Sequence, residues 1–316
     1  RCIVNSAFED FEHDRKLPPE FVEEQKRVSG ESQQVWEAAK EKSDFKLFEP
    51  YLKKIVALKR QEAGYLQEKG QTLYDALIDD YEPGYDAAKL EVIFKELKDF
   101  LVPFIQKIQG ASSWVKPDII KKPVDIGLQM KFAKLVARKI GYDINSGGIH
   151  LSVHPFSTSF HPTDARITTR CKRRNFISDC LLSLVHECGH AMYEQGLLPE
   201  FFGTPMAESV SFGVHESQSR LWENLVGHSM PFWMYFYPKM QMMVPQFKNI
   251  SLADFYGAIN CVRPSLVRVD ADEVTYNLHI ILRFEIEKLL IEGQIEVEDL
   301  PTVWNQKVKE YLGLEV

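Results

Sequence analysis

Residues 176–195 read FISDCLLSLVHECGHAMYEQ, and this stretch decides what kind of fold the chain adopts. Its apolar residues recur at helical spacing and form one stripe. The stripe consists of Ile177, Cys180, Leu181, Leu184, Val185 and Cys188. His186 and His190 lie on the opposite face, about 40° apart if each residue turns the helix by about 100°. The stretch therefore predicts a helix that packs by one side and presents two imidazoles on the other.

The spacing His-Glu-x-x-His allows both imidazoles to bind a single metal ion. The alternative is a chance pair of histidines, which residue frequencies would produce in on the order of one chain in a hundred. Imidazole with carboxylate suits Zn²⁺, which in hydrolases usually has three protein ligands and a position for water. We therefore expect His186 and His190 to bind zinc, although Co²⁺ and Mn²⁺ can occupy similar sites.

A third ligand is expected from the next predicted helix, Ala207 to Val226. Its apolar stripe consists of Val210, Val214, Leu221 and Leu225. The other side carries three carboxylates, Glu208, Glu216 and Glu223, and spacing alone leaves the choice among them open. We take Glu216, 26 residues after His190, as the ligand. The other two are expected in solvent or beside the ligands.

Glu187 directly follows the first histidine and points to the flank of the ligand face. Zinc lowers the pKa of its bound water from 15.7 to about 7. Glu187 can accept the proton of that water and deliver it to the leaving amine. We therefore expect Glu187 to be the general base of a metal-dependent hydrolase.

Helical patterns run along most of the chain, which predicts a mainly α architecture. The predicted helices are Phe21 to Lys42, Phe48 to Lys69, Ala87 to Gln109, Pro123 to Ile140, Phe176 to Gln195, Ala207 to Val226, Leu252 to Asn260, Asp272 to Ile291 and Leu300 to Tyr311. Between Gly147 and Thr169 apolar and polar residues alternate, with proline-marked turns. This is the one region that predicts strands.

The composition fits a chain of 316 residues that buries a substantial core, because 45% of its positions are hydrophobic. The net charge of −7 predicts no general affinity for nucleic acid or anionic membranes. The longest apolar uncharged run, Leu225 to Pro238, is far shorter than the roughly 20 residues that span a bilayer, and it is expected to be core or a substrate-facing wall. Five scattered cysteines favour a reducing compartment. With the acidic balance and no visible export signal, they favour the cytoplasm.

Several separated motifs resemble the carboxypeptidase Taq family of zinc metallocarboxypeptidases, and their order and spacing agree over most of the chain. The motifs are Tyr81-Glu82-Pro83-Gly84, His154-Pro155-Phe156, Asp164-Ala165-Arg166-Ile167-Thr168, His186 to Gly196, His215-Glu216-Ser217-Gln218-Ser219 and Val267 to Glu273. The resemblance implies that His186, His190 and Glu216 bind zinc and that Glu187 is the catalytic acid and base.

The same resemblance implies a mostly helical, neurolysin-like fold with a central cleft and a small β-sheet beside the active site. Family members remove single residues from peptide C-termini with broad specificity, and they are usually homodimers. They also continue beyond the segment that matches Tyr311-Leu312-Gly313, with a Gly-x-x-Gln-Asp-x-His-Trp motif and a following tyrosine. We therefore expect residues 1–316 to be a single helical metallopeptidase domain without the terminal segments of the full-length family.

An exopeptidase that acts at a C-terminus needs a cation for the free carboxylate. The arginine of the family's Arg-x-x-x-Asp motif matches Arg268, with Asp272 as its aspartate. A guanidinium binds a carboxylate through two parallel hydrogen bonds. Without the resemblance, a salt bridge from Arg268 to Asp270 or Asp272 is an equal alternative.

Three further residues are candidate substrate contacts. Asp164 and Arg166 lie in the strand region, where an exposed edge could pair with an extended peptide. A purely structural pairing between these two side chains is an equal alternative. His215 is expected to contact either the substrate or a metal ligand.

The first functional hypothesis is a zinc carboxypeptidase. A zinc oligopeptidase that cuts internally is the second, and only the first depends on a free substrate carboxylate. The third is a zinc-binding structural or interaction subunit that lacks catalytic parts.

Overall fold

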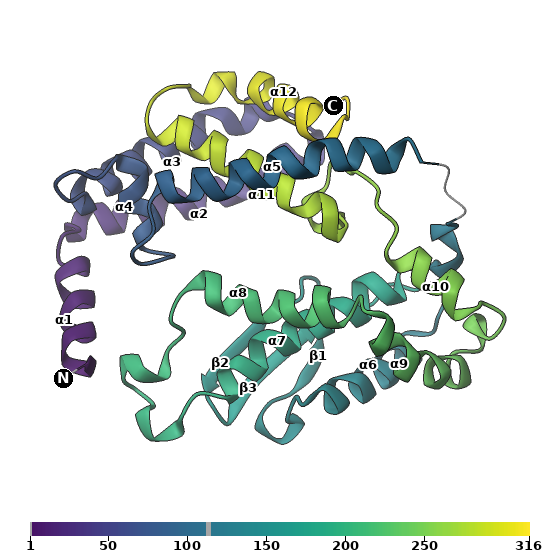
Figure 1. The fold of residues 1–316 in the computed structure, drawn as a ribbon. Coiled ribbons are helices and arrows are strands. Elements are labelled where there is room, and N and C mark those ends of the chain that lie inside the picture. Colours follow the sequence, from purple (N-terminus) through teal and green to yellow (C-terminus); the bar gives the residue numbers. More distant parts are fainter. Residues whose placement is uncertain (1, 112–114) are drawn as a thin grey trace. The chain divides into compact units, whose positions relative to one another are not determined.

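The computed structural model describes residues 2–111 and 115–316 and forms two compact units. One unit combines Arg1–Ala111 with Val262–Val316, and the other is Ser112–Cys261. The fold is mainly helical with one small sheet, as predicted (Figure 1). None of the helices within the described residues has both the length and the apolar character needed to cross a membrane.

The first unit is entirely helical in its described part. Its helices are α1 (Cys2–Asp14), α2 (Pro19–Lys42), α3 (Phe45–Leu66), α4 (Leu73–Asp79), α5 (Ala87–Gln109), α11 (Glu273–Ile291) and α12 (Leu300–Leu312), with 3-10 turns at Arg268–Asp270 and Val297–Asp299. Helix α11 is central because it packs against α3, α4, α5 and α12. Leu278, Ile281 and Leu282 are fully buried there, which explains why α11 is apolar around most of its circumference.

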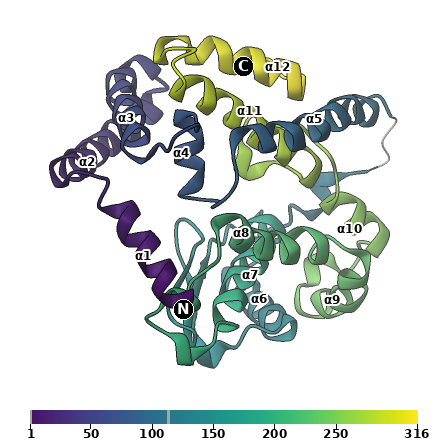
Figure 2. The same cartoon turned by 60° about the vertical axis from the view of Figure 1, so that its left-hand side comes forward.

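The second unit contains the sheet and the predicted metal helix. Its helices are α6 (Ile126–Ile140), α7 (Ser183–Gln195), α8 (Phe212–Arg220), α9 (Met230–Met243) and α10 (Leu252–Ile259). Short 3-10 turns span Pro117–Ile120, Ile144–Ser146, Pro199–Phe201, Pro205–Ala207 and Pro245–Phe247, and π-helical segments span Phe176–Leu182 and Leu221–Val226. Figure 2 shows α9 and α10 beside each other in this unit.

The sheet has the strand order β1-β3-β2, formed by β1 (Ile149–Leu151), β2 (Ser157–His161) and β3 (Asp164–Thr169). Strand β3 pairs in parallel with β1 and antiparallel with β2. Its buried residues Ala165 and Ile167 belong to the same core cluster as Leu184, Val185 and Cys188 of α7. The apolar side of α7 therefore packs on the sheet, and the sheet supports the helix that carries the two histidines.

The apolar run from Leu225 to Pro238 was expected to be core or a substrate-facing wall, and most of it forms α9. Phe232, Trp233 and Phe236 are buried in the core of the second unit. The indole nitrogen of Trp233 donates a hydrogen bond to the carbonyl of Gly227 at 2.8 Å, so its one polar atom is satisfied. The core interpretation is therefore correct for these three side chains.

The helix predicted over Ala207 to Val226 is only partly correct. The α-helix begins at Phe212, because the Ser211 side chain accepts the backbone N–H of Val214 and caps it. Its predicted apolar stripe is also wrong as a guide to packing. Val210, Val214, Leu221 and Leu225 are all exposed.

Helix α8 packs through small residues instead. Ser219 is fully buried, and its Cα lies where a side chain on Gly189 of α7 would be: an added Cβ would stand 2.5 Å from that atom. The same Cβ would stand 2.6 Å from the carbonyl oxygen of Gln218. Because real Cβ atoms do not approach backbone this closely, only glycine permits this helix–helix distance.

We expect Gly189→Ala to lower the free energy of unfolding by about 1–3 kcal/mol, because α8 must move away from α7. Urea unfolding followed by circular dichroism measures the change. Gly30→Ala is the matched control, since a Cβ at Gly30 in α2 meets nothing within 4 Å and should stabilise the helix by roughly 0.5–1 kcal/mol. Equal effects of the two substitutions would contradict the close packing.

Candidate metal centre

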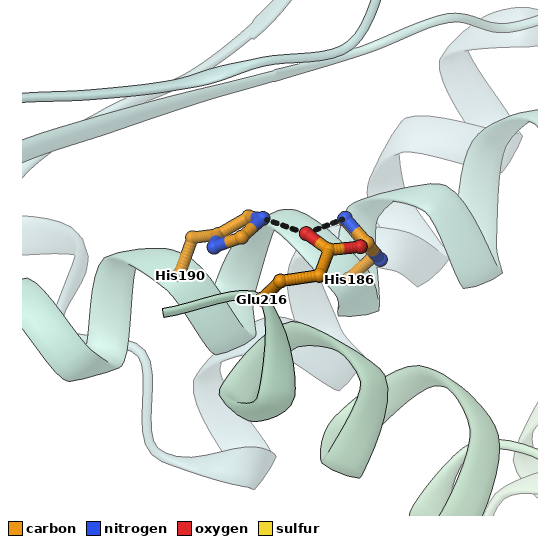
Figure 3. Close-up of side chains that lie close together, drawn as sticks. All are labelled: His186, His190 and Glu216. Carbon is orange, nitrogen blue, oxygen red and sulfur yellow. Dashed lines mark ion pairs between the residues drawn. The ribbon is translucent and has the colours of Figure 1, made fainter. Parts of the chain in front are cut away.

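The contact between α7 and α8 brings the three predicted ligands together. His186 and His190 project from α7, and Glu216 projects from α8 toward both rings (Figure 3). The Oε2 atom of Glu216 lies 3.2 Å from Nε2 of His190 and 3.7 Å from Nε2 of His186. One ligand atom from each residue lies within 4.8 Å of the other two. Three separated sequence positions therefore form one compact donor set.

This donor set fits a divalent metal ion. Atoms that bind one ion at about 2 Å lie roughly 3–4 Å from one another in a tetrahedral arrangement. The distances from Glu216 Oε2 to the two Nε2 atoms, 3.2 Å and 3.7 Å, fall in this range. Two imidazole nitrogens and one carboxylate oxygen are also a donor set that zinc accepts.

Glu216 is held as an anion. Burial would raise the pKa of its carboxyl, but the hydrogen bond from His190 and the charges of His186 and Arg220 lower the pKa to about 2. Arg220 Nε donates to Glu216 Oε1 at 3.1 Å, which leaves Oε2 directed at the histidines. The carboxylate therefore presents one oxygen for coordination while the other is fixed by a guanidinium.

Glu223 positions the first histidine. Its Oε2 lies 2.8 Å from Nδ1 of His186, so Nδ1 carries the hydrogen and Nε2 is free to coordinate. Burial favours neutral His186, but the bond to Glu223 outweighs it and raises the pKa of the imidazole. Arg220 Nη1 also donates to Glu223, at 3.0 Å. Arg220 thus binds both Glu216, the predicted third ligand, and Glu223, the partner of His186.

The second histidine is held mainly by ring packing. The ring of His215 stacks on His190 with centroids 4.5 Å apart and planes 17° apart. His215 Nε2 in turn lies 2.8 Å from a carboxylate oxygen of Glu194. Within the described residues, the buried Nδ1 atom of His190 has no hydrogen-bond partner. His215 thus contacts a predicted metal ligand, which was one of its two expected roles.

Glu187 is only 7% exposed, although it lies between the two histidines in sequence. Burial is the main reason why the pKa of its carboxyl rises to about 7; the charge of His186 opposes this rise, and those of Glu216 and Glu223 add to it. A carboxyl with this pKa exchanges protons near neutrality. Its environment thus differs sharply from that of Glu216, on the neighbouring helix.

Asp164 and Arg166 pair with each other. The guanidinium of Arg166 donates to both carboxylate oxygens of Asp164, at 2.7 and 2.8 Å, and also lies over the ring of Phe160. The structural pairing considered above is therefore present in β3. Arg166 remains exposed, on the side of the strand opposite the buried Ala165 and Ile167.

Arg268 belongs to the first unit, and its Nη1 donates to the hydroxyl of Tyr276 at 3.1 Å. Asp272, the expected ion-pair partner, instead caps α11: Oδ1 accepts the backbone N–H groups of Val274 and Thr275, each at 3.0 Å. Because Asp272 caps α11, it is not the salt-bridge partner that was considered for Arg268. The side chain of Asp270, the other alternative, lies outside the described residues.

Sequence reasoning missed the partner roles of Arg220 and Glu194. Both carried a local signal, because Arg220 follows Glu216 by four residues and Glu194 follows His190 by four, so each lies on the same helical face as a ligand. Glu223 was expected in solvent or beside the ligands. It lies beside them.

Comparisons with known proteins point to one peptidase family. Residues 1–316 match a family model described as carboxypeptidase Taq (M32) metallopeptidase. Thermostable carboxypeptidase 1 of Thermus thermophilus is 41% identical over 312 residues, which cover 96% of this chain and 61% of the relative. Carboxypeptidase 1 of Bacillus subtilis is 38% identical over 312 residues, with coverages of 98% and 62%.

Solved structures give the same result. The M32 carboxypeptidase from Deinococcus radiodurans R1 is 40% identical and matches with a TM-score of 0.95, over 99% of this chain and 63% of that one. The chain therefore spans 61% to 63% of the length of these three relatives.

We expect Glu223→Gln to weaken metal binding about 10- to 100-fold, because His186 loses its charged partner. Competition with a chelator of known affinity measures the dissociation constant. Glu208→Gln removes the same charge from an exposed position before α8 and should leave that constant unchanged. An unchanged affinity in Glu223→Gln would show that Glu223 does not support the site.

Proposed function

The chain belongs to the carboxypeptidase Taq (M32) metallopeptidase family, and we propose that it carries the catalytic site of a metal-dependent carboxypeptidase that hydrolyses the C-terminal bond of peptides. The observation that carries this proposal is the convergence of His186, His190 and Glu216 within 4.8 Å, next to the buried carboxyl of Glu187. The relatives described above are carboxypeptidases by name, which supports the same activity.

His186, His190 and Glu216 would hold the metal, and we propose zinc because two nitrogens and one carboxylate suit it. A divalent ion at this position supplies Lewis acidity, which acidifies water and polarises a carbonyl group. Glu223 and Arg220 keep the donor atoms oriented, through bonds of 2.8–3.1 Å. The arrangement of the donors therefore needs little change when a substrate binds.

Glu187 would move the protons of the reaction. The pKa of its carboxyl, raised to about 7 chiefly by burial, allows it both to take a proton from the attacking water and to return it to the leaving amine. Glu216 would not share this role, because its carboxylate faces His186 and His190 as the third metal ligand and its pKa is lowered rather than raised. The two glutamates thus divide into one ligand and one acid–base group according to their surroundings.

Arg268 would bind the free carboxylate of the substrate. Its guanidinium is oriented by the Tyr276 hydroxyl, and Asp272 is engaged elsewhere as a helix cap. A planar guanidinium binds a carboxylate through two parallel hydrogen bonds. This interaction would select peptides with an uncapped C-terminus, as a carboxypeptidase must.

Further properties of the proposal come from the family resemblance and the composition. They are broad side-chain specificity, a homodimeric assembly, a cytoplasmic location, and substrate contacts by Asp164, Arg166 and His215. The interactions of Asp164 with Arg166 and of His215 with Glu194 mean that each would meet the substrate from a fixed position.

We expect Glu187→Gln to retain the metal and to lose turnover by about 10²- to 10⁴-fold, since the amide cannot accept the proton. Metal content by elemental mass spectrometry and kcat on a short free-acid peptide are the two measurements. Wild-type turnover in this variant would exclude Glu187 as the acid–base group.

We expect Arg268→Ala to raise KM for free-acid peptides by about 10- to 100-fold, because a charge-assisted pair of hydrogen bonds is lost. Mass spectrometry of free-acid peptides and their amidated twins, incubated with the metal-loaded chain, separates the hypotheses. Loss of single residues from free acids alone supports the carboxypeptidase, whereas internal cuts of both forms support an oligopeptidase. Arg263→Ala, at an exposed neighbouring position, is the control. Equal effects of Arg268→Ala on both peptide forms would exclude its role.

A further inference from the structure

Two cysteines outside the metal centre lie close enough to react with each other. Cys171 follows strand β3 by two residues, and Cys180 lies in the π-helical segment that leads into α7. Their sulfur atoms are 2.6 Å apart. A disulfide bond is about 2.05 Å long. We propose that Cys171 and Cys180 form a redox modification site, at which a small-molecule disulfide such as oxidised glutathione generates an intramolecular disulfide bond.

The backbone on both sides holds the two sulfurs together. The hydroxyl of Thr169 donates to the carbonyl oxygen of Cys180 at 2.9 Å. Arg170 forms an ion pair with Asp179, and Lys172 Nζ lies 3.4 Å from the other oxygen of that carboxylate. The neighbours of Cys171 in sequence, Arg170 and Lys172, thus contact Asp179, the residue before Cys180. The close approach of the thiols is therefore part of the local structure.

The two thiols differ in accessibility and acidity. Cys171 is partly exposed, whereas Cys180 is fully buried. The contact with Cys180 lowers the pKa of Cys171, and the same contact together with burial raises the pKa of Cys180. The thiolate is the reactive form of cysteine. Cys171 is therefore the group that an external disulfide meets first, and Cys180 is placed to complete the reaction.

The reaction has two balanced steps. The Cys171 thiolate attacks one sulfur of glutathione disulfide, a protein–glutathione disulfide forms, and one glutathione leaves as a thiolate. Cys180 then gives up its proton, its sulfur attacks the sulfur of Cys171, and the second glutathione leaves. The two protein thiols are oxidised to one disulfide, and one glutathione disulfide is reduced to two molecules of glutathione.

The bond would fasten the metal helix to the sheet. Cys180 precedes His186 by six residues on a continuous helical run, and Cys171 follows the central strand β3. The cross-link would close a sequence separation of nine residues. A short closed loop restricts the unfolded chain and stabilises the folded one. The oxidation state of this pair would thus control how firmly α7 is held against β3.

The test uses the metal-loaded chain in a series of buffers with increasing ratios of oxidised to reduced glutathione. After acid quenching and alkylation, intact mass spectrometry counts the remaining thiols, and peptide mapping locates the link. We expect two fewer alkylated thiols than the five of the reduced chain, a Cys171–Cys180 peptide, and a melting temperature about 5 °C higher. Reduction with dithiothreitol should restore all five thiols.

Variants make the test specific. Cys261→Ser should form the bond as the unmodified chain does, whereas Cys171→Ser should form none and show no thermal shift. Cys180→Ser should accumulate a glutathione adduct on Cys171. If Cys180→Ser does not fold because the position is buried, Cys171→Ser, at a partly exposed position, still shows whether the thermal shift requires the disulfide. Five alkylated thiols at the most oxidising ratio, or a persistent adduct on Cys171 of the unmodified chain, would overturn the assignment.

Discussion

The rest of the site depends on the backbone contact between α7 and α8 at Gly189. This residue stands one position before His190, and an added Cβ would lie 2.5 Å from the Cα of Ser219. The contact allows Glu216, three residues before Ser219, to approach the histidines at 3.2 and 3.7 Å. A glutamate side chain is long and flexible enough to reach its partners when the helix shifts slightly. A fixed helix–helix distance is still needed to keep its oxygen between the two imidazoles. Gly189, which has no side chain, therefore constrains the spacing of the three donor residues as strictly as the donor residues themselves do.

The contact also gathers an unusual amount of charge in a partly buried region. The carboxylates of Glu194, Glu216 and Glu223 each have a histidine or arginine partner within 3.2 Å. Glu187 is the exception: burial and its like-charged neighbours raise the pKa of its carboxyl to about 7. Pairing keeps a carboxylate charged, and its absence lets burial neutralise one. Burial therefore accompanies a lowered pKa at Glu216 and a raised one at Glu187, and the difference lies in which cations are within reach.

The sequence was most informative where local spacing determines structure. The helix over Ala87 to Gln109 has the predicted bounds, and α7 has the predicted packing side, because both follow from a period of 3.6 residues. The start of α8 was misjudged by five residues, since the Ser211 cap overrides the apolar pattern that begins earlier. Val214 in α8, Val210 before it and Leu225 after it show why such a pattern fails as a guide to burial. Helix α8 packs by backbone contact at Ser219, and these apolar side chains remain exposed. Partners such as Glu223 for His186 join positions 37 residues apart, which no local rule specifies.

A π-helical segment adjoins each of the two helices, α7 and α8, that carry the predicted metal ligands. One, Phe176–Leu182, leads into α7, and the other, Leu221–Val226, continues α8. Glu223 lies in the second, seven residues after Glu216. In a regular α-helix seven residues turn the chain by about 700°, close to two full turns, so both carboxylates face the same neighbouring helix. A π turn is wider and changes the direction in which the following side chains point. Glu223 contacts Nδ1 of His186, whereas Glu216 lies near Nε2 of the same ring. Each ring nitrogen of His186 thus has its own carboxylate, Glu216 from α8 and Glu223 from the π-helical segment that continues it.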